Sequence, residues 1–142
     1  MTEKKKRNKK SKHGCPGKGY RALLYYVQGR RCYLCDKPMT DPSLNKTVGS
    51  TNATSYDHIV PGIRGVNPRE NVALCHAACN LKKGDRPPTE EELVRGRVYF
   101  EMASQFKIKR LDTDLFKFVH RTDPAASVIY ERPKGKYDKK GQ

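Results

Sequence analysis

Four of the five cysteines occur in two groups along this chain, and these groups restrict its fold more than any other feature. Cys32 and Cys35 form the first group, in the stretch CYLC, and the second stretch, CHAAC, contains Cys75, His76 and Cys79. A tetrahedral zinc site takes four nitrogen or sulfur ligands, commonly two from each of two such groups. We therefore expect a structural zinc bound by the first pair, by Cys79 and by one further ligand. Cys75 and His76 are both open for that position, because residues three or four apart share one face of a helix.

The composition explains why the chain would need this zinc. Only 35% of its 142 residues are hydrophobic and 32% are charged, so the core must be small, and small cores depend on disulfides or a metal. The first residues, MTEKKKRNKKSKHG, have the positive stretch of a secretory signal without the apolar stretch that follows it. No apolar run reaches membrane-spanning length. We expect an intracellular protein, cytoplasmic or nucleoid-associated, whose five cysteines are metal ligands or buried thiols rather than disulfides.

Positive charge is concentrated near the N-terminus. The net charge is +15, and residues 1–31 contain eleven of the 30 Lys and Arg residues but a single acid. Such a segment buries too little apolar surface to fold alone, so we predict a disordered basic arm over residues 1–18. The natural partner of the arm is a polyanion, of which nucleic acid is the commonest. The alternative is a solubilising or targeting tail.

A helix and a strand are predicted in the first half of the chain. Leu23, Leu24 and Val27 lie on one side of a helical pattern that stops at Gly29, which predicts a leading helix over residues 19–31. The stretch TSYDHIV is rich in β-branched and aromatic residues and comes before a proline, which predicts a strand.

Helices are predicted for most of the second half. The stretch NVALCHAACNLKKG is compatible with a short helix and completes a predicted core at residues 32–86. Thr89 and Glu92 have the spacing of a capping box. They open an amphipathic helix whose apolar residues are Leu93, Val94, Val98, Phe100 and Met102. With DTDLFKFVH as one more short helix, residues 87–120 form a C-terminal helical extension, and residues 121–142 form a tail.

An acid directly before a histidine, Asp57–His58, lies in the predicted strand. If the zinc holds the two cysteine groups together, this strand runs beside the following helix, and Asp57 can face Asn80. A carboxylate and an amide oxygen suit Mg²⁺, which completes its shell with water and phosphate oxygens. An imidazole beside such a metal can accept a proton from water. Without these partners, His58 would be an ordinary, partly buried histidine.

The pattern C-x-x-C … DHIVP … N-V-A-L-C-H-x-x-C-N-x-x-K-G, from Cys32 to Gly84, resembles the HNH endonuclease family in its zinc-bearing form. These enzymes are also called ββα-metal or His-Me finger nucleases. The resemblance implies an α+β fold with a small, treble-clef-like ββα-metal core stapled by a structural zinc. Flanking helices and basic disordered tails would surround this core.

The family's site residues carry over to matching positions. The resemblance implies that His58 activates water for attack on a phosphodiester and that Asp57 and Asn80 hold one Mg²⁺ or Mn²⁺. It implies that Asn71 fastens the loop between strand and helix, so that the histidine points correctly. It also implies a zinc bound by the residue three before the last cysteine, which gives the set Cys32, Cys35, His76 and Cys79.

Nucleic acid is the implied substrate. Arg64, Lys82 and Lys83 are predicted phosphate contacts, with solvated basic residues as the alternative. The expected function is a metal-dependent HNH endonuclease that acts on nucleic acid. Double-stranded DNA is the preferred prediction for this substrate over RNA, and no membrane partner is expected. One alternative is a zinc-stapled nucleic-acid-binding module without cleavage activity, and the complete catalytic set argues against it. The other is a redox or regulatory zinc protein, and the basic arm and the Mg²⁺-type pair argue against that.

Overall fold

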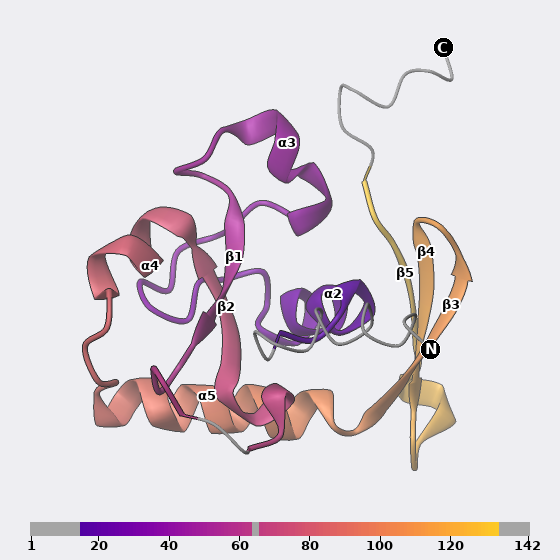
Figure 1. Cartoon of the computed structure of the whole chain (residues 1–142). Coiled ribbons are helices and arrows are strands. Elements are labelled where there is room, and N and C mark those ends of the chain that lie inside the picture. Colours follow the sequence, from indigo (N-terminus) through magenta and orange to yellow (C-terminus); the bar gives the residue numbers. More distant parts are fainter. Residues whose placement is uncertain (1–14, 64–65, 134–142) are drawn as a thin grey trace, which may run out of the picture.

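Two short strands in the middle of the chain form an antiparallel pair. In the computed structural model of the chain, which describes residues 15–63 and 66–133, β1 (Thr54–His58) pairs with β2 (Val72–His76) (Figure 1). The helix α4 (Ala77–Lys83) follows β2 directly and contacts both strands. The strand predicted at TSYDHIV is therefore confirmed.

The helix predicted across NVALCHAACNLKKG is half wrong, because its first part is the strand β2. Four consecutive side chains of this strand, from Val72 to Cys75, are buried. A short continuous apolar run fits a buried strand as well as a helix, and periodicity alone does not separate the two. Pairing with β1 decides in favour of the strand, and only residues 77–83 are helical.

The predicted leading helix is confirmed as α2 (Lys18–Val27), which supplies much of the core. Leu23, Leu24 and Val27 are all buried, as the pattern predicts. The buried amide of Gln28, just after the helix, donates to the Leu74 carbonyl at 3.0 Å and accepts from the Leu74 N–H at 2.8 Å. These two bonds tie the end of α2 to β2.

The segment before β1 is held by side-chain hydrogen bonds. It contains the 3₁₀ turn η1 (Pro42–Leu44) and the single-turn helix α3 (Asn45–Val48). The amide of Asn45 donates to the Thr54 carbonyl at 2.9 Å and accepts from its N–H at 3.0 Å. The side chain of Asn45, in this polar segment, thus fixes the first residue of β1.

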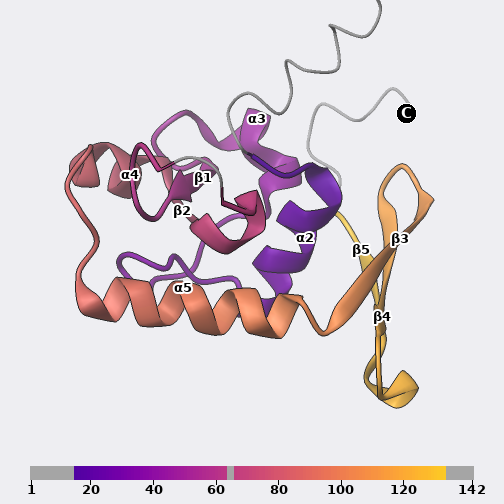
Figure 2. The same cartoon turned by 60° about the horizontal axis from the view of Figure 1, so that its bottom comes forward.

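The helix α5 (Glu90–Ala103) begins as predicted but buries a different face. Thr89 and Glu92 form the capping box. The buried positions are Glu92, Gly96 and Ala103, whereas four of the five residues of the predicted apolar set are exposed: Leu93, Val94, Val98 and Met102. A Cβ on Gly96 would lie 2.4 Å from Ile59 Cδ1, so the helix approaches the chain after β1 through its glycine. Figure 2 shows α5 running below the hairpin and α2.

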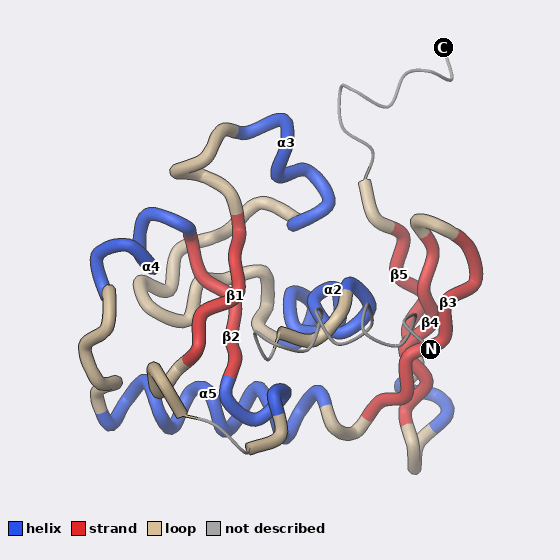
Figure 3. Tube along the Cα trace, viewed as in Figure 1, coloured by secondary structure: helices blue, strands red, loops and turns tan. Residues whose placement is uncertain are grey.

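The helical extension and tail predicted for the C-terminal part are wrong between residues 106 and 131. This segment forms a three-stranded antiparallel sheet of β3 (Phe106–Asp112), β4 (Leu115–His120) and β5 (Val128–Glu131), with the 3₁₀ turn η3 (Pro124–Ala126) before β5. Phe116 and Phe118 are buried on alternate positions of β4, and Tyr130 of β5 stacks on Phe118. Figure 3 shows this sheet on the opposite side of α2 from β1 and β2.

The predicted α+β class is confirmed for the described residues, which form two antiparallel sheets and intervening helices. Among these residues, no helix is long and apolar enough to cross a membrane. The predicted basic arm, apart from its last few residues, and the tail beyond residue 133 lie outside the described part of the chain.

Candidate functional site

Four side chains from the two cysteine groups converge as the sequence predicts. Sulfur and nitrogen atoms of Cys32, Cys35, His76 and Cys79 all lie within 4.8 Å of one another. His76 Nδ1 is 3.4 Å from the sulfur of Cys35 and 3.7 Å from that of Cys79. The first two ligands come from the turn after α2, His76 ends β2, and Cys79 lies in α4. Three thiols and one imidazole are a donor set that suits a tetrahedral structural zinc.

Hydrogen bonds around the cluster favour metal binding. The Sγ atom of Cys32 accepts from the backbone N–H groups of Leu34 and Cys35, at 3.3 and 3.4 Å. His76 Nε2 lies 3.0 Å from the Pro38 carbonyl. A carbonyl can only accept, so Nε2 carries the proton and Nδ1 keeps its lone pair for a metal. The backbone thus fixes the tautomer that a zinc ligand needs.

Cys75 does not belong to this cluster. Successive side chains of a strand point to opposite faces, so His76 and its neighbour Cys75 face different ways from β2. Cys75 is fully buried, and burial raises the pKa of its thiol strongly. Cys75 is therefore a packed, protonated thiol, and the choice that the spacing leaves open falls on His76.

A second group of predicted residues lines one hollow. Asp57, His58 and Asn80 border a cavity of about 260 Å³ at the end of β1, beside the middle of α4 and the turn at Gly84. Asn80 lies one position after Cys79, so the zinc-type cluster and this hollow share a helix. The structure therefore brings the amide of Asn80 beside the carboxylate and the imidazole of Asp57 and His58, which lie 23 and 22 residues earlier in the sequence.

Asp57 is buried and has two polar partners. Its Oδ2 atom accepts a hydrogen bond from the Tyr33 hydroxyl and lies 3.3 Å from the Lys83 ammonium. Burial, together with the bond to Asp57, raises the pKa of Tyr33, so the phenol stays a neutral donor. Tyr33 directly follows Cys32, and its N–H donates to the Leu74 carbonyl at 3.1 Å. The first cysteine turn is thereby connected to both Asp57 and β2.

Asn71 lies outside the hollow and holds the loop after β1. Its side chain accepts from the Val60 N–H at 2.9 Å and donates to the Val60 carbonyl at 3.1 Å. Its own carbonyl accepts from the N–H of Ile59 at 2.8 Å. Asn71 ends the 3₁₀ turn η2 (Pro68–Asn71), so these bonds close the long connection between the strands.

The predicted phosphate contacts are placed differently from one another. Lys82 is exposed, whereas Lys83 is only 4% exposed. Lys83 Nζ donates to the His58 carbonyl at 3.3 Å in addition to its ion pair with Asp57. The expectation of a phosphate contact at Lys83 is therefore corrected, because its ammonium is bound by the Asp57 carboxylate and the His58 carbonyl at the end of β1. Arg64 lies outside the described residues.

Two residues of the site have no signal in the sequence. Tyr33 reaches Asp57 from 24 positions away, and only the folded chain shows the contact. Asp85 follows the turn at Gly84 and adds a second carboxylate to the rim of the hollow. An acid directly after the glycine that ends a helix is too common to be recognised as functional.

No protein-family model, curated protein or solved structure matches this chain. Evidence for its chemistry therefore lies in its own geometry. That geometry offers two centres: a thiol–imidazole cluster able to hold zinc, and an oxygen-lined hollow with an imidazole at its edge.

Proposed function

We propose that this chain is a metal-dependent endonuclease of the HNH type, with a ββα-metal core that hydrolyses phosphodiester bonds, those of double-stranded DNA in particular. One observation carries the proposal: Asp57, His58 and Asn80 line a single hollow next to the Cys₃His cluster. The net charge of +15 favours a polyanionic substrate.

His58 acts as the general base. Its side chain is partly exposed at the end of β1 and lines the hollow, where a water and a phosphodiester could enter. An imidazole in this position takes the proton of the attacking water. Asn71 keeps the following loop in place, so that the histidine is held at the rim.

Asp57 and Asn80 are the residues that would hold a divalent cation. They offer oxygen donors of the kind that Mg²⁺ prefers, and within the described residues no hydrogen bond reaches Asp57 Oδ1. When bound, such a cation would stabilise the negative charge that develops on the phosphate and on the leaving oxygen. Tyr33 and Lys83 position Asp57 through its other oxygen.

The same ion pair favours a second candidate function. Lys83 already neutralises Asp57, and an ammonium at this place opposes a second cation. A chain with this arrangement and no bound cation would be a zinc-stapled nucleic-acid-binding module without cleavage activity. The two functions differ in a single property, which is cleavage in the presence of Mg²⁺.

Plasmid cleavage by the purified chain, with and without added Mg²⁺ or Mn²⁺, separates the two functions. We expect cleavage that requires the added cation, and a reduction of about 10²–10⁴-fold in rate for His58→Ala. Zinc content, thermal unfolding and DNA binding of this variant should stay as in the wild type, because the side chain is at the rim.

His58→Gln is the matched control, since it keeps the size and polarity of the side chain without a basic nitrogen. We expect it to be as inactive as His58→Ala. Recovery of activity in His58→Gln would show that the histidine only packs. A folded His58→Ala chain that cuts at the wild-type rate would refute the assignment. Absence of any cleavage by the wild type, with DNA binding intact, would favour the binding module.

A further inference from the structure

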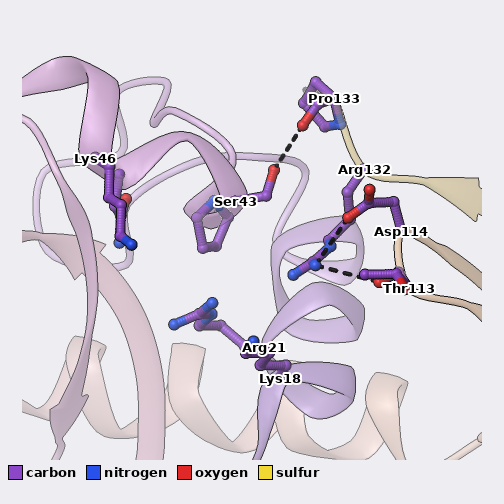
Figure 4. A pocket seen from close by; sticks show the side chains of 10 residues that line it. Lys18, Arg21, Ser43, Lys46, Thr113, Asp114, Arg132 and Pro133 are labelled. Atoms are coloured by element: carbon purple, nitrogen blue, oxygen red, sulfur yellow. Dashed lines mark hydrogen bonds and ion pairs between the residues drawn. The ribbon is translucent and has the colours of Figure 1, made fainter. Parts of the chain in front are cut away.

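A second hollow in the molecule is lined by positive charge and shares no lining residue with the candidate active site. It has a volume of about 530 Å³ and lies between the start of α2, the segment of η1 and α3, and the turn between β3 and β4 with the end of β5. Four basic residues border it: Lys18, Arg21, Lys46 and Arg132. Figure 4 shows Arg21, Lys46 and the tip of Arg132 pointing into the same space.

The basic side chains are mostly unneutralised. The single acid at the rim, Asp114, forms a 3.0 Å ion pair with Arg132. Within the described residues, the side chains of Lys18, Arg21 and Lys46 make no ion pair or hydrogen bond. Among the other polar residues that line the hollow, Ser43 and Asn45 bond the carbonyls of Pro133 and Thr54, and the Thr113 carbonyl accepts from Arg132. The cations are therefore the groups that a ligand would meet.

Two arginines in this hollow are held close together in a partly buried place. Burial is the main cause that lowers the pKa of Arg21, and the nearby charge of Arg132 also lowers it, whereas Tyr56 and the buried Asp41 raise it. An arginine remains charged under any ordinary condition. The side chain of Arg132 is 11% exposed, and its buried Nε–H has no partner within the described residues. Arg132 already bonds Asp114 and the Thr113 carbonyl, so the donors free to receive an anion are those of Lys18, Arg21 and Lys46.

We infer that this hollow binds a backbone phosphate of the nucleic-acid substrate, away from the bond that is cut. Guanidinium groups match the geometry of phosphate oxygens, and the negative charge of a phosphodiester reduces the excess positive charge of the hollow. The inference rests on the proposed action on nucleic acid and assigns a flanking contact to it. Binding itself does not require that the chain cleaves its ligand.

The strand β1 connects the two hollows. Asn45, on the wall of the basic hollow, is bonded to Thr54 at the start of β1, and His58 at the other end of β1 lines the candidate active site. From Thr54 to His58 the chain advances by four residues, and four residues of a β-strand cover about 13 Å. The same length corresponds to about four nucleotides along one strand of a duplex.

The test is duplex binding as a function of salt, measured by fluorescence anisotropy with a labelled duplex of about 20 base pairs and no divalent cation. We expect Arg21→Gln/Lys46→Gln to bind at least tenfold more weakly at low salt. The slope of log affinity against log salt should become shallower by about 2, since about one counterion fewer is released for each lost contact. Lys46→Gln alone changes an exposed residue and should reduce the slope by about 1.

Lys107→Gln/Lys109→Gln is the matched control, because it removes the same charge from two exposed positions of β3. An equal loss in both double variants would show that net charge alone matters and would overturn the inference. Unchanged duplex binding in Arg21→Gln/Lys46→Gln, together with lost binding of inorganic phosphate by calorimetry, would assign the hollow to a free anion and also overturn it. A wild-type chain that binds duplex and never cuts it would refute the nuclease proposal and leave this inference standing.

Discussion

At the scale of single residues, the zinc-type cluster depends on the direction in which two neighbouring side chains leave β2. His76 points to the cluster, and Cys75 packs into the core on the other face. We therefore expect the wild type to bind about one zinc per chain, and His76→Ala to lose this zinc and much of its resistance to heat, because structural zinc contributes folding energy directly. Elemental analysis of the purified variant, together with thermal unfolding, checks this.

Cys75→Ala is the control for that prediction, since it deletes one small buried group and no ligand. It should keep about one zinc per chain and lose only a modest part of its stability. Loss of zinc from this variant, with zinc retained in His76→Ala, would reverse the assignment.

The sequence pointed to the four residues of the Cys₃His cluster and to Asp57, His58 and Asn80 of the hollow, but not to Tyr33, Asp85 or the contacts within the site. Spacing alone left the choice between Cys75 and His76 open, and the HNH pattern pointed to His76. The strand makes that choice clear, because alternation puts the two residues on opposite faces. The bonds of Tyr33 and Lys83 to Asp57 were not predictable, since they join residues that are 24 and 26 positions apart.

At the scale of elements, α5 shows why an apolar pattern can mislead. Its apolar residues predicted the buried face, yet the helix packs through Gly96, and its buried Glu92 is held by Arg86 and by the capping box. A glycine allows an approach that a pattern of large side chains does not reveal. The prediction of a helix at LFKFVH was wrong for a related reason. Its buried residues alternate, as in a strand, but a stretch of six residues also fits a short helix.

The contact of Gly96 with Ile59 gives a prediction at this scale. We expect Gly96→Ala to be destabilised by about 1 kcal/mol, because overpacking costs about 1–3 kcal/mol and alanine returns about 1 kcal/mol of helix propensity. Ile59→Val removes the Cδ1 atom that lies 2.4 Å from the added Cβ, and alone it should cost about 0.5–1.5 kcal/mol. Urea unfolding of both variants and of the double variant measures the coupling.

The double variant should be more stable than the sum of the single changes predicts, by about 1 kcal/mol. Strictly additive free energies of unfolding would show that the helix moves away from Ile59 instead of pressing on it. Because Ile59 follows His58, cleavage by Gly96→Ala should fall together with its stability and recover in the double variant.

At the scale of the whole molecule, the C-terminal sheet braces the segment that leads into β1. Tyr130 of β5 stacks on Phe118 and donates a hydrogen bond to the buried Asp41. Asp41 also accepts from the N–H of Ser43 at 2.8 Å, and the hydroxyl of Thr54 donates to the neighbouring Thr40 carbonyl at 2.6 Å. Residues 106–131, predicted as helix and tail, are thus connected to the strand that carries the candidate active site.

Tyr130 and Ile129 are neighbours on β5 and test this bracing as a matched pair. Tyr130→Ala removes a buried ring and leaves Asp41 without one of its partners, so we expect a loss of about 3–5 kcal/mol in the free energy of unfolding. Ile129→Ala changes a side chain that is 58% exposed, and its cost should not exceed about 1 kcal/mol. Urea unfolding with fluorescence or circular dichroism gives both values.

The number of unfolding transitions separates two possibilities. If the C-terminal sheet were an independent appendage, the sheet of Tyr130→Ala would unfold in a transition of its own, and zinc content and DNA cleavage would stay unchanged. If it braces the molecule as the contacts indicate, unfolding stays a single transition at lower denaturant, and zinc is released in the same step.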